Sequence, residues 1–429
     1  MEAIFGVLVV VLVIALMARV LTRREARRPP ETTEHALTTP PPTFRVVTLG
    51  VSGSGKTVFL ASMFHRMSVQ RADVRYFLET DAAQRVALNS VFNKARKTDE
   101  PWPRGTRTGE TREFTFACMS FQEGVKYEVL RLNYLDYAGE LLEQEQEAGS
   151  TALADLEQRI NQAHALVGMI DGYRVLQYLK GAPEGQEYIE VRIQPMLGMM
   201  AAATCPIHLV LSKWDLVRDF GEPEDADDNA RLALVRDALF KSALIKALAG
   251  GHGRGPRVVR LIPVSAVGRK FATLDASGIV VKRPDGEWDP TNIEAPLSAV
   301  LPDAFSQVRA AHDQALQTEL QTRVRSHMRL SFGGLIAALA KFLSIPTGIA
   351  LRATLETTLG RPYGEEMASM FLDWVSRPFD DRAGVAKGAI EEAEGQFTAL
   401  RRAREDVFDQ FAATIWRLEA ILPASVLSR

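Results

Sequence analysis

Residues 44–67 read FRVVTLGVSGSGKTVFLASMFHRM, the segment that says most about the fold class of this chain. Its first seven residues form a mostly apolar run that is as long as one short buried strand. Residues 56–67 have the pattern of a helix with apolar side chains on several of its faces. Between the two, the segment from Gly50 to Thr57 matches the pattern G-x-x-x-x-G-K-[ST] in full. The sequence therefore predicts a strand, a phosphate-binding loop and a helix in direct succession.

The residue types of this loop are those that an anion-binding site requires. Glycine permits the backbone angles that turn successive N–H groups toward a phosphate, and the N-terminus of the following helix adds a partial positive charge. We expect Lys56 to reach the β- and γ-phosphates of a nucleotide and the Thr57 hydroxyl to bind Mg²⁺. The predicted phosphate-contacting residues are Gly50, Ser52, Gly53, Ser54, Gly55, Lys56 and Thr57.

Short apolar runs alternate with helical stretches after this loop. The strand-like runs are 112–121, 127–137, 164–172, 206–215 and 258–266, and the helical stretches are 143–163, 187–203 and 228–249. A short turn at Glu123-Gly124 is expected to join the first two runs, and residues 278–288 are expected to form a hairpin that turns at Pro284-Asp285-Gly286. Such alternation implies right-handed crossovers and an α/β fold, a mainly parallel sheet with flanking helices. Ligands of such sheets bind beyond the carboxyl ends of the strands, and polar clusters of this chain fall at those ends.

One of these clusters is Leu-Asp-Tyr-Ala-Gly-Glu, residues 135–140. At the end of a strand, Asp136 can hold Mg²⁺ through water, and the N–H of Gly139 can bond the γ-phosphate. Two further clusters suit a purine base. The carboxylate of Asp215 can accept from both N1–H and the exocyclic amine of guanine, the stem of Lys213 can cover the purine face, and a backbone N–H at Ser265-Ala266 can meet guanine O6.

Taken in this order, the clusters resemble the motifs of P-loop GTPases of the translation-factor-related class over residues 44–325. The resemblance makes 50–57 the first motif, 136–139 the third, 212–215 the fourth and 265–266 the fifth. The family usually has Asn or Thr where Ser212 stands, and serine can still hydrogen-bond toward the phosphate loop. The family often has Gln where Glu140 stands, and a carboxylate there can orient or deprotonate water but also repels the γ-phosphate.

The second motif of that family requires a threonine that binds Mg²⁺ and senses the γ-phosphate. Residues 101–114, PWPRGTRTGETREF, offer Thr106, Thr108 and Thr111, and the turn-rich approach favours Thr106. The resemblance thus implies catalytic roles for Lys56, Glu140 and Thr106, and a metal set of Thr57, Asp136 and Thr106.

The N-terminal segment is the most apolar in the chain. Residues 3–21 carry one charge, Arg19, and arginines follow the run, so residues 1–22 are predicted to form an uncleaved transmembrane anchor contacting membrane lipid, rather than a cleaved signal peptide. The positive-inside rule then places the N-terminus outside and the rest in the cytoplasm. Residues 23–43 are basic and Pro/Thr-rich and are expected to form a tether. This layout is similar to that of the signal recognition particle receptor β subunit.

The region 326–429 is predicted to be helical. Apolar positions between Ile390 and Leu422 recur at spacings of three and four, which indicates one long helix whose stripe packs inside the molecule or against a partner. Residues 330–351 are apolar but broken by Pro and Gly, which favours a packed hairpin over a membrane contact.

Bulk properties exclude several other classes. The formal net charge of −2 does not indicate nucleic-acid binding, and two distant cysteines with seven scattered histidines show no metal-site spacing. We therefore expect a membrane-anchored GTP-binding switch that needs Mg²⁺, hydrolyses GTP slowly and has a protein effector or activating partner. The alternatives are a nucleotide-binding scaffold without turnover, which Glu140 favours, and an ATPase component of a transport or secretion machine.

Overall fold

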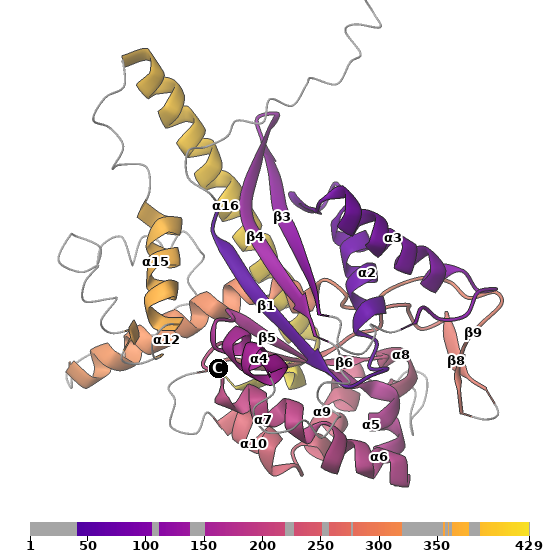
Figure 1. The fold of residues 1–429 in the computed structure, drawn as a ribbon. Coiled ribbons are helices and arrows are strands. Elements are labelled where there is room, and N and C mark those ends of the chain that lie inside the picture. The colour runs from indigo at the N-terminus through magenta and orange to yellow at the C-terminus, as the bar shows by residue number, and fades with distance from the viewer. Residues whose placement is uncertain are drawn as a thin grey trace, which may run out of the picture.

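The computed structural model describes residues 41–104, 111–137, 151–218, 227–250, 257–275, 278–319, 355–356, 359, 363–376 and 387–428. Its centre is an eight-stranded sheet with the order β10-β7-β6-β5-β1-β4-β3-β2 (Figure 1). The strands are β1 (Thr43–Gly50), β2 (Tyr76–Glu79), β3 (Arg112–Gln122), β4 (Val125–Asp136), β5 (Ala165–Asp171), β6 (Ile207–Ser212), β7 (Val259–Pro263) and β10 (Val426–Ser428).

The five central strands are parallel, and the outer strands are antiparallel. Strands β4, β1, β5, β6 and β7 pair in parallel, whereas β3, β2 and β10 run against their neighbours. All residues of β5 and β6 are buried, as expected for strands covered on both faces. The predicted mixed α/β fold with a mainly parallel sheet is confirmed.

The predicted turn between the two strand-like runs at 112–137 is also confirmed. Strands β3 and β4 form a hairpin in which Glu123 and Gly124 both have positive φ, 53° and 84°. Positive φ at both central residues is the signature of the two-residue turn whose twist matches that of the strands.

Helices occupy the connections, although two predicted ones are divided. The helices are α2 (Lys56–Met67), α3 (Ala82–Arg96), α4 (Thr151–Asn161), α5 (Gly172–Leu179), α6 (Pro183–Glu187), α7 (Gln194–Ala202), α8 (Trp214–Val217), α9 (Asp228–Leu239), α10 (Ala243–Gly250), α11 (Ala295–Ser298), α12 (Val300–Glu319), α15 (Tyr363–Ser376) and α16 (Lys387–Ile421), with a π-helix η2 (Tyr188–Arg192) and a 3₁₀ turn η3 (Pro423–Ser425). The stretch 187–203 splits because Pro195 lies in the first turn of α7, where no backbone donor is needed.

The long C-terminal helix packs onto the sheet. Phe411 of α16 meets Tyr76 of β2 edge-on at 4.9 Å between ring centroids, and Phe408 stacks on Phe305 of α12. The buried positions of its stripe are Leu400, Val407, Phe411, Ile415, Leu418 and Leu422. The stripe is therefore part of the intramolecular core, and β10 after it adds an edge strand beside β7. The division of the chain into 44–325 and 326–429 stays a prediction.

The predicted single-pass membrane localisation is contradicted. Within the part of the chain that the structure describes, no helix is both long and apolar enough to span a bilayer. A spanning helix needs about 20 mostly apolar residues, whereas α16, at 35 residues, carries charged side chains along its length. The segment 1–22 on which the prediction rested, residues 23–40 of the tether and the run 330–351 lie outside the described residues.

A second hairpin differs in position from the prediction. Residues 283–286 do form a turn, in which the N–H of Gly286 donates to the carbonyl of Arg283 at 3.0 Å, but this turn does not close the hairpin. Strand β8 (Ala272–Leu274) pairs with β9 (Val280–Lys282), so the connection of the hairpin spans 275–279. Asp275 explains the shift because its carboxylate accepts the N–H of Ile279 at 2.9 Å, and Gly278 supplies a positive φ of 76°. An Asp side chain bonded to nearby backbone is a common turn device.

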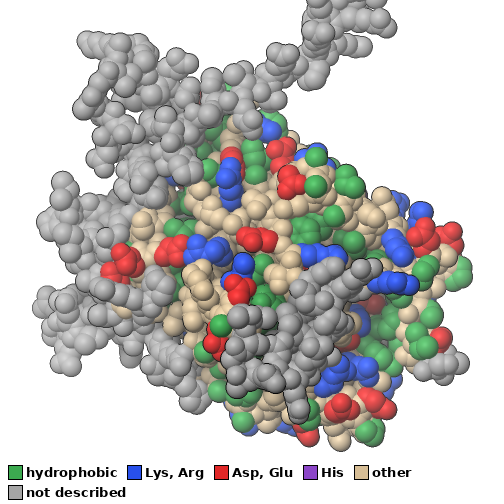
Figure 2. Space-filling view, in the orientation of Figure 1, with side chains coloured by type: hydrophobic (Ala, Val, Ile, Leu, Met, Phe, Trp, Pro, Cys, Tyr) green, Lys and Arg blue, Asp and Glu red, His purple; other side chains and the backbone are tan. Residues whose placement is uncertain are grey.

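Charges of both signs are interspersed on the face shown in Figure 2, but one charged network is buried. Arg260 of β7 grips Asp303 of α12 with two hydrogen bonds of 2.5 Å and reaches Glu419 of α16 at 2.6 Å, while His208 of β6 lies 2.9 Å from Asp303. Burial alone would raise the pKa of Asp303, but the charge of Arg260 and hydrogen bonds from Arg260 and His208 outweigh it and lower the pKa to about 2. The network ties α12 and α16 to the sheet.

We predict that Asp303→Asn lowers the free energy of unfolding at pH 7 by about 3–5 kcal/mol, because it removes the buried negative charge that makes two of the hydrogen bonds of the Arg260 guanidinium. The pKa of an unfolded Asp is about 3.9. The contribution of Asp303 is therefore complete above pH ~4 and is lost as the pH falls toward 2, so the two proteins should converge in that window. Denaturant unfolding at a series of pH values measures this.

Asp237→Asn is the control. Asp237 also pairs with an arginine, at 2.9 Å, but its side chain is 67% exposed, and exposed pairs contribute little. Equal unfolding midpoints for Asp303→Asn and Asp237→Asn at pH 7 would contradict the importance of the buried network.

Candidate functional site

The predicted phosphate-binding loop connects β1 to α2. Gly53 and Gly55 have φ of 77° and 93°, backbone that favours glycine. Gly50 is needed for a different reason, since a Cβ there would lie 2.8 Å from Cβ of Met169 on the adjacent strand β5. The loop therefore takes its shape both from local backbone angles and from the close approach of β5.

The predicted lysine lies across this loop. Lys56 begins α2, its side chain is buried, and its ammonium donates to the carbonyls of Gly50 at 2.5 Å and Val51 at 3.3 Å. Lys56 and the following residue, Thr57, both line a cavity beside this loop. A positive charge and a hydroxyl are thus placed at the start of a helix, where a phosphate group is favoured.

The end of β6 is hydrogen-bonded to the loop. The hydroxyl of Ser212 contacts the carbonyls of Ser54 at 2.7 Å and Ile170 at 3.1 Å, so it bridges β5, β6 and the loop. Lys213, in left-handed backbone with φ of 51°, donates its ammonium to the carbonyl of Gly53 at 3.0 Å. Serine in place of the family's usual Asn or Thr therefore does reach the phosphate loop.

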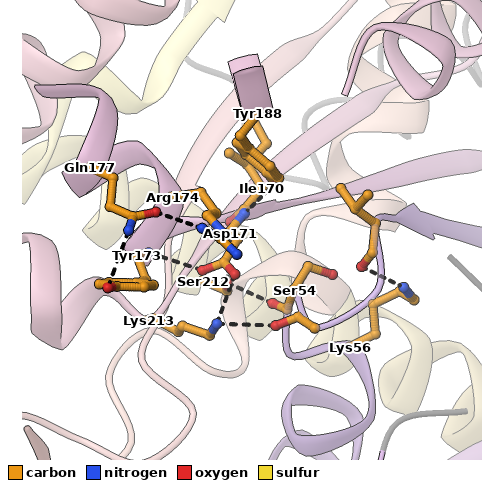
Figure 3. Close-up of polar contacts among 12 residues, drawn as sticks. Ser54, Lys56, Ile170, Asp171, Tyr173, Arg174, Gln177, Tyr188, Ser212 and Lys213 are labelled. Carbon is orange, nitrogen blue, oxygen red and sulfur yellow. Dashed lines mark hydrogen bonds and ion pairs between the residues drawn. The ribbon is translucent and has the colours of Figure 1, made fainter. Parts of the chain in front are cut away.

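Asp171 is a residue of the site that the sequence did not predict. It ends β5 and caps α5 by accepting the N–H of Tyr173 at 3.0 Å, and its other oxygen pairs with Lys213 at 2.8 Å (Figure 3). Its backbone N–H donates to the hydroxyl of Tyr188 in the π-helix at 2.7 Å, and burial raises the pKa of that phenol. The signal in the sequence was an Asp before Gly172 at the end of a strand. Its partner Lys213 lies 42 residues away in the sequence and could not be predicted from it.

The predicted base-reading residues are adjacent. The Ser265 hydroxyl donates to Asp215 at 2.6 Å and accepts the N–H of Gly268 at 2.8 Å, which fixes the carboxylate. The N–H of Ser265 itself donates to the carbonyl of Thr291 at 3.1 Å. Of the predicted pair, Ala266 is the residue that lines the cavity.

A cavity of about 320 Å³ brings these parts together. The predicted residues that line it are Ser52, Gly53, Ser54, Gly55, Lys56, Thr57, Ser212, Lys213, Asp215 and Ala266. Asp136 does not line it but ends β4, buried, beside Thr48 of β1. Thr106, Gly139 and Glu140 lie outside the described residues, and so does the alternative Thr108.

Fold and loop together define a P-loop nucleotide-binding domain. Residues 45–248 match the model of the Double-GTPase 2 family, and this part of the chain is a P-loop GTPase domain of the translation-factor-related type, as predicted. A comparison with curated proteins gave no match.

Two solved structures are similar to the chain. One is the signal recognition particle receptor SRb-GTP/SRX complex from Chaetomium thermophilum, with 13% identity, a TM-score of 0.27 and coverage of 54% of this chain and 93% of that chain. The other is a dimerization-deficient mutant of Toc33 from Arabidopsis thaliana, with 15% identity, a TM-score of 0.30 and coverage of 62% and 85%. At these scores neither likeness carries an argument about function.

We predict that Gly50→Ala destabilises the protein by about 1–3 kcal/mol, since the added methyl overpacks the contact between β1 and β5. Thermal unfolding of the purified chain measures the effect. Gly198→Ala is the matched control: a Cβ at this exposed position of α7 meets nothing within 4 Å, and the same substitution there should stabilise by about 0.5–1 kcal/mol. The packing argument fails if both variants unfold at the same temperature.

Proposed function

We propose that this chain binds GTP with Mg²⁺, hydrolyses it slowly and acts as a nucleotide-dependent switch. The observation that carries the proposal is the Asp215 carboxylate, held at 2.6 Å by the Ser265 hydroxyl at the cavity that also contains the phosphate loop. Polar groups for a base and for phosphates thus share one cavity.

Guanine is favoured over adenine by the chemistry of this carboxylate. Guanine presents two adjacent donors, N1–H and the exocyclic amine, which one carboxylate can accept together, whereas adenine presents no such pair. A site built to hydrogen-bond a ligand group discriminates strongly against a ligand that lacks it, because its polar atoms are left unpaired. The N–H of Ala266 is the proposed donor to guanine O6.

Magnesium is proposed on the chemistry of the available donors. Mg²⁺ prefers hydroxyl, carboxylate and phosphate oxygens and retains several waters. Thr57 at the cavity and the buried carboxylate of Asp136, which ends a strand beside β1, fit that preference. Thr57 would contact the ion directly and Asp136 through water, with Thr106 as the proposed third ligand. Bound Mg²⁺ would offset negative charge on the phosphates.

The proposed hydrolysis and switching depend on a small set of groups. Lys56 neutralises part of the charge that develops on the γ-phosphoryl oxygens, and Glu140 is the proposed group that handles the attacking water. Ordering of the segments around Thr106 and residues 136–140 by the γ-phosphate would provide the switch, and a protein partner would respond to it or accelerate hydrolysis.

Base discrimination provides the direct test. Asp215→Asn should weaken GTP binding by about 10- to 100-fold, the value of a charge-assisted hydrogen bond, and should relax the preference over ATP. Competition titrations with labelled GTP measure both effects. Asp237→Asn is the control, since this carboxylate is 67% exposed and pairs with its neighbour Arg236. If ATP displaces labelled GTP from the wild type at the same concentrations as unlabelled GTP, the proposal of guanine preference is wrong.

Turnover by the isolated protein should be very slow. An arginine finger accelerates this chemistry by roughly 10³–10⁵, and we expect the isolated protein to work without one. Lys56→Ala should abolish binding or hydrolysis. Glu140→Gln separates two roles in single-turnover measurements: a lower or unchanged rate fits a water-handling group, and a higher rate means that Glu140 mainly repels the phosphate. Rapid turnover by dilute wild type that neither substitution changes would contradict the proposed machinery.

A further inference from the structure

The cavity has a second set of lining residues that the nucleotide motifs do not include. Trp102 and Pro103 follow α3, and Ala272 and Val280 belong to the β8–β9 hairpin, which lies beyond the fifth motif (Figure 1). We infer that Trp102 and this hairpin form a side wall that retains bound nucleotide and sets its rate of release. The inference rests on the proposed function and adds to it the regulation of the same site.

The two halves of the wall are joined directly. The indole N–H of Trp102 donates to the carbonyl of Val280 at 2.9 Å, a contact across 178 positions of the sequence. Phe271 packs edge-on against Trp102 at 6.1 Å and against Trp288 at 5.0 Å. These rings belong to a small core around Val267, Phe271 and Ala272 that is separate from the main core. Such packing holds the tryptophan ring in one place at the cavity.

Lys282 fastens the wall from the outside. Its ammonium lies 4.8 Å from the centroid of the Trp102 ring and donates to the carbonyls of Lys94 at 2.8 Å and Lys97 at 2.7 Å. Those carbonyls belong to the last turn and C-cap of α3, where a cation is favoured. Partial burial lowers the pKa of Lys282. The hairpin is thereby fixed to α3 as well as to Trp102.

The segment that follows the hairpin is bonded to the residues just after the fifth motif. The N–H of Asp289 donates to the carbonyl of Val267 at 3.1 Å, and Gly268, with φ of 94°, would bring a Cβ within 2.2 Å of the Asp289 carbonyl oxygen. Residues 265–268 therefore connect the proposed base contact at Ala266 to the segment that follows the hairpin. Asp215 and Ala266 supply polar recognition, whereas Trp102, Ala272 and Val280 supply an apolar surface from which a departing nucleotide must separate.

Release of a fluorescently labelled GDP from the full-length chain, chased with excess GDP, tests the inference. Trp102→Ala should release at least ~10-fold faster, because removing the ring weakens the bound state, and such changes act mainly on the off-rate. Trp102→Phe keeps a ring but cannot donate to Val280 and should release roughly 3-fold faster. The GTP-over-ATP preference should stay unchanged in both variants, since Asp215 is intact. Lys282→Ala should accelerate release as well, and it replaces Trp102→Ala if that variant does not fold.

Trp416→Phe is the control, because Trp416 is 55% exposed on α16 and does not line the cavity. Energy transfer from tryptophan to the label adds a readout of proximity: Trp102→Phe should lose a larger share of it than Trp416→Phe. If the wild type binds the labelled nucleotide and every wall variant releases it at the wild-type rate, the inference is overturned and the proposed function is not. A wild type that binds no guanine nucleotide would overturn the proposed function, and this inference with it.

Discussion

The parallel pairing of β1 with β5, and of β5 with β6, determines where the functional residues of this protein lie. Gly50 faces Met169 across the first pair, and Ser212 faces Asp171 across the second. Carboxyl ends of parallel strands meet at one edge of the sheet, so three loops from distant parts of the sequence arrive together. The Ser212 hydroxyl then joins them with hydrogen bonds to Ser54 and Ile170. These bonds fix the phosphate loop to the ends of β5 and β6 beside the cavity.

Local signals predicted one part of this arrangement well. The strand, loop and helix of residues 43–67 are set by glycine angles, by an apolar run and by the helix start, all of which are readable within a short window. The turn at Glu123-Gly124 was readable for the same reason. The π-helix at Tyr188 was not predicted, and the bond from the Asp171 backbone N–H to the Tyr188 hydroxyl that accompanies it is a tertiary contact.

Contacts between distant segments account for the other residues that the sequence left unassigned. Trp102 stood in a Pro-rich approach to the candidate threonines, and nothing near it indicated a partner at Val280. The stripe of α16 was periodic, yet periodicity alone does not say whether such a face meets the sheet or another protein. The ring contact between Phe411 and Tyr76 and the ion pair between Arg260 and Glu419 decide it. Hydrophobic spacing predicts that a face is covered, and only tertiary structure shows by what.

Lys213 connects the two ends of the cavity. Its ammonium joins the carbonyl of Gly53 in the phosphate loop to the carboxylate of Asp171, while its backbone directly precedes α8, which carries Asp215. Residue 213 has left-handed backbone, which costs free energy in a non-glycine residue and persists only where surrounding contacts hold it. Those contacts are the two bonds of its own side chain. The Lys213 side chain therefore links the phosphate loop to the end of β5, and its backbone leads directly into α8 with Asp215, so the positions of the loop and of this carboxylate depend on one residue.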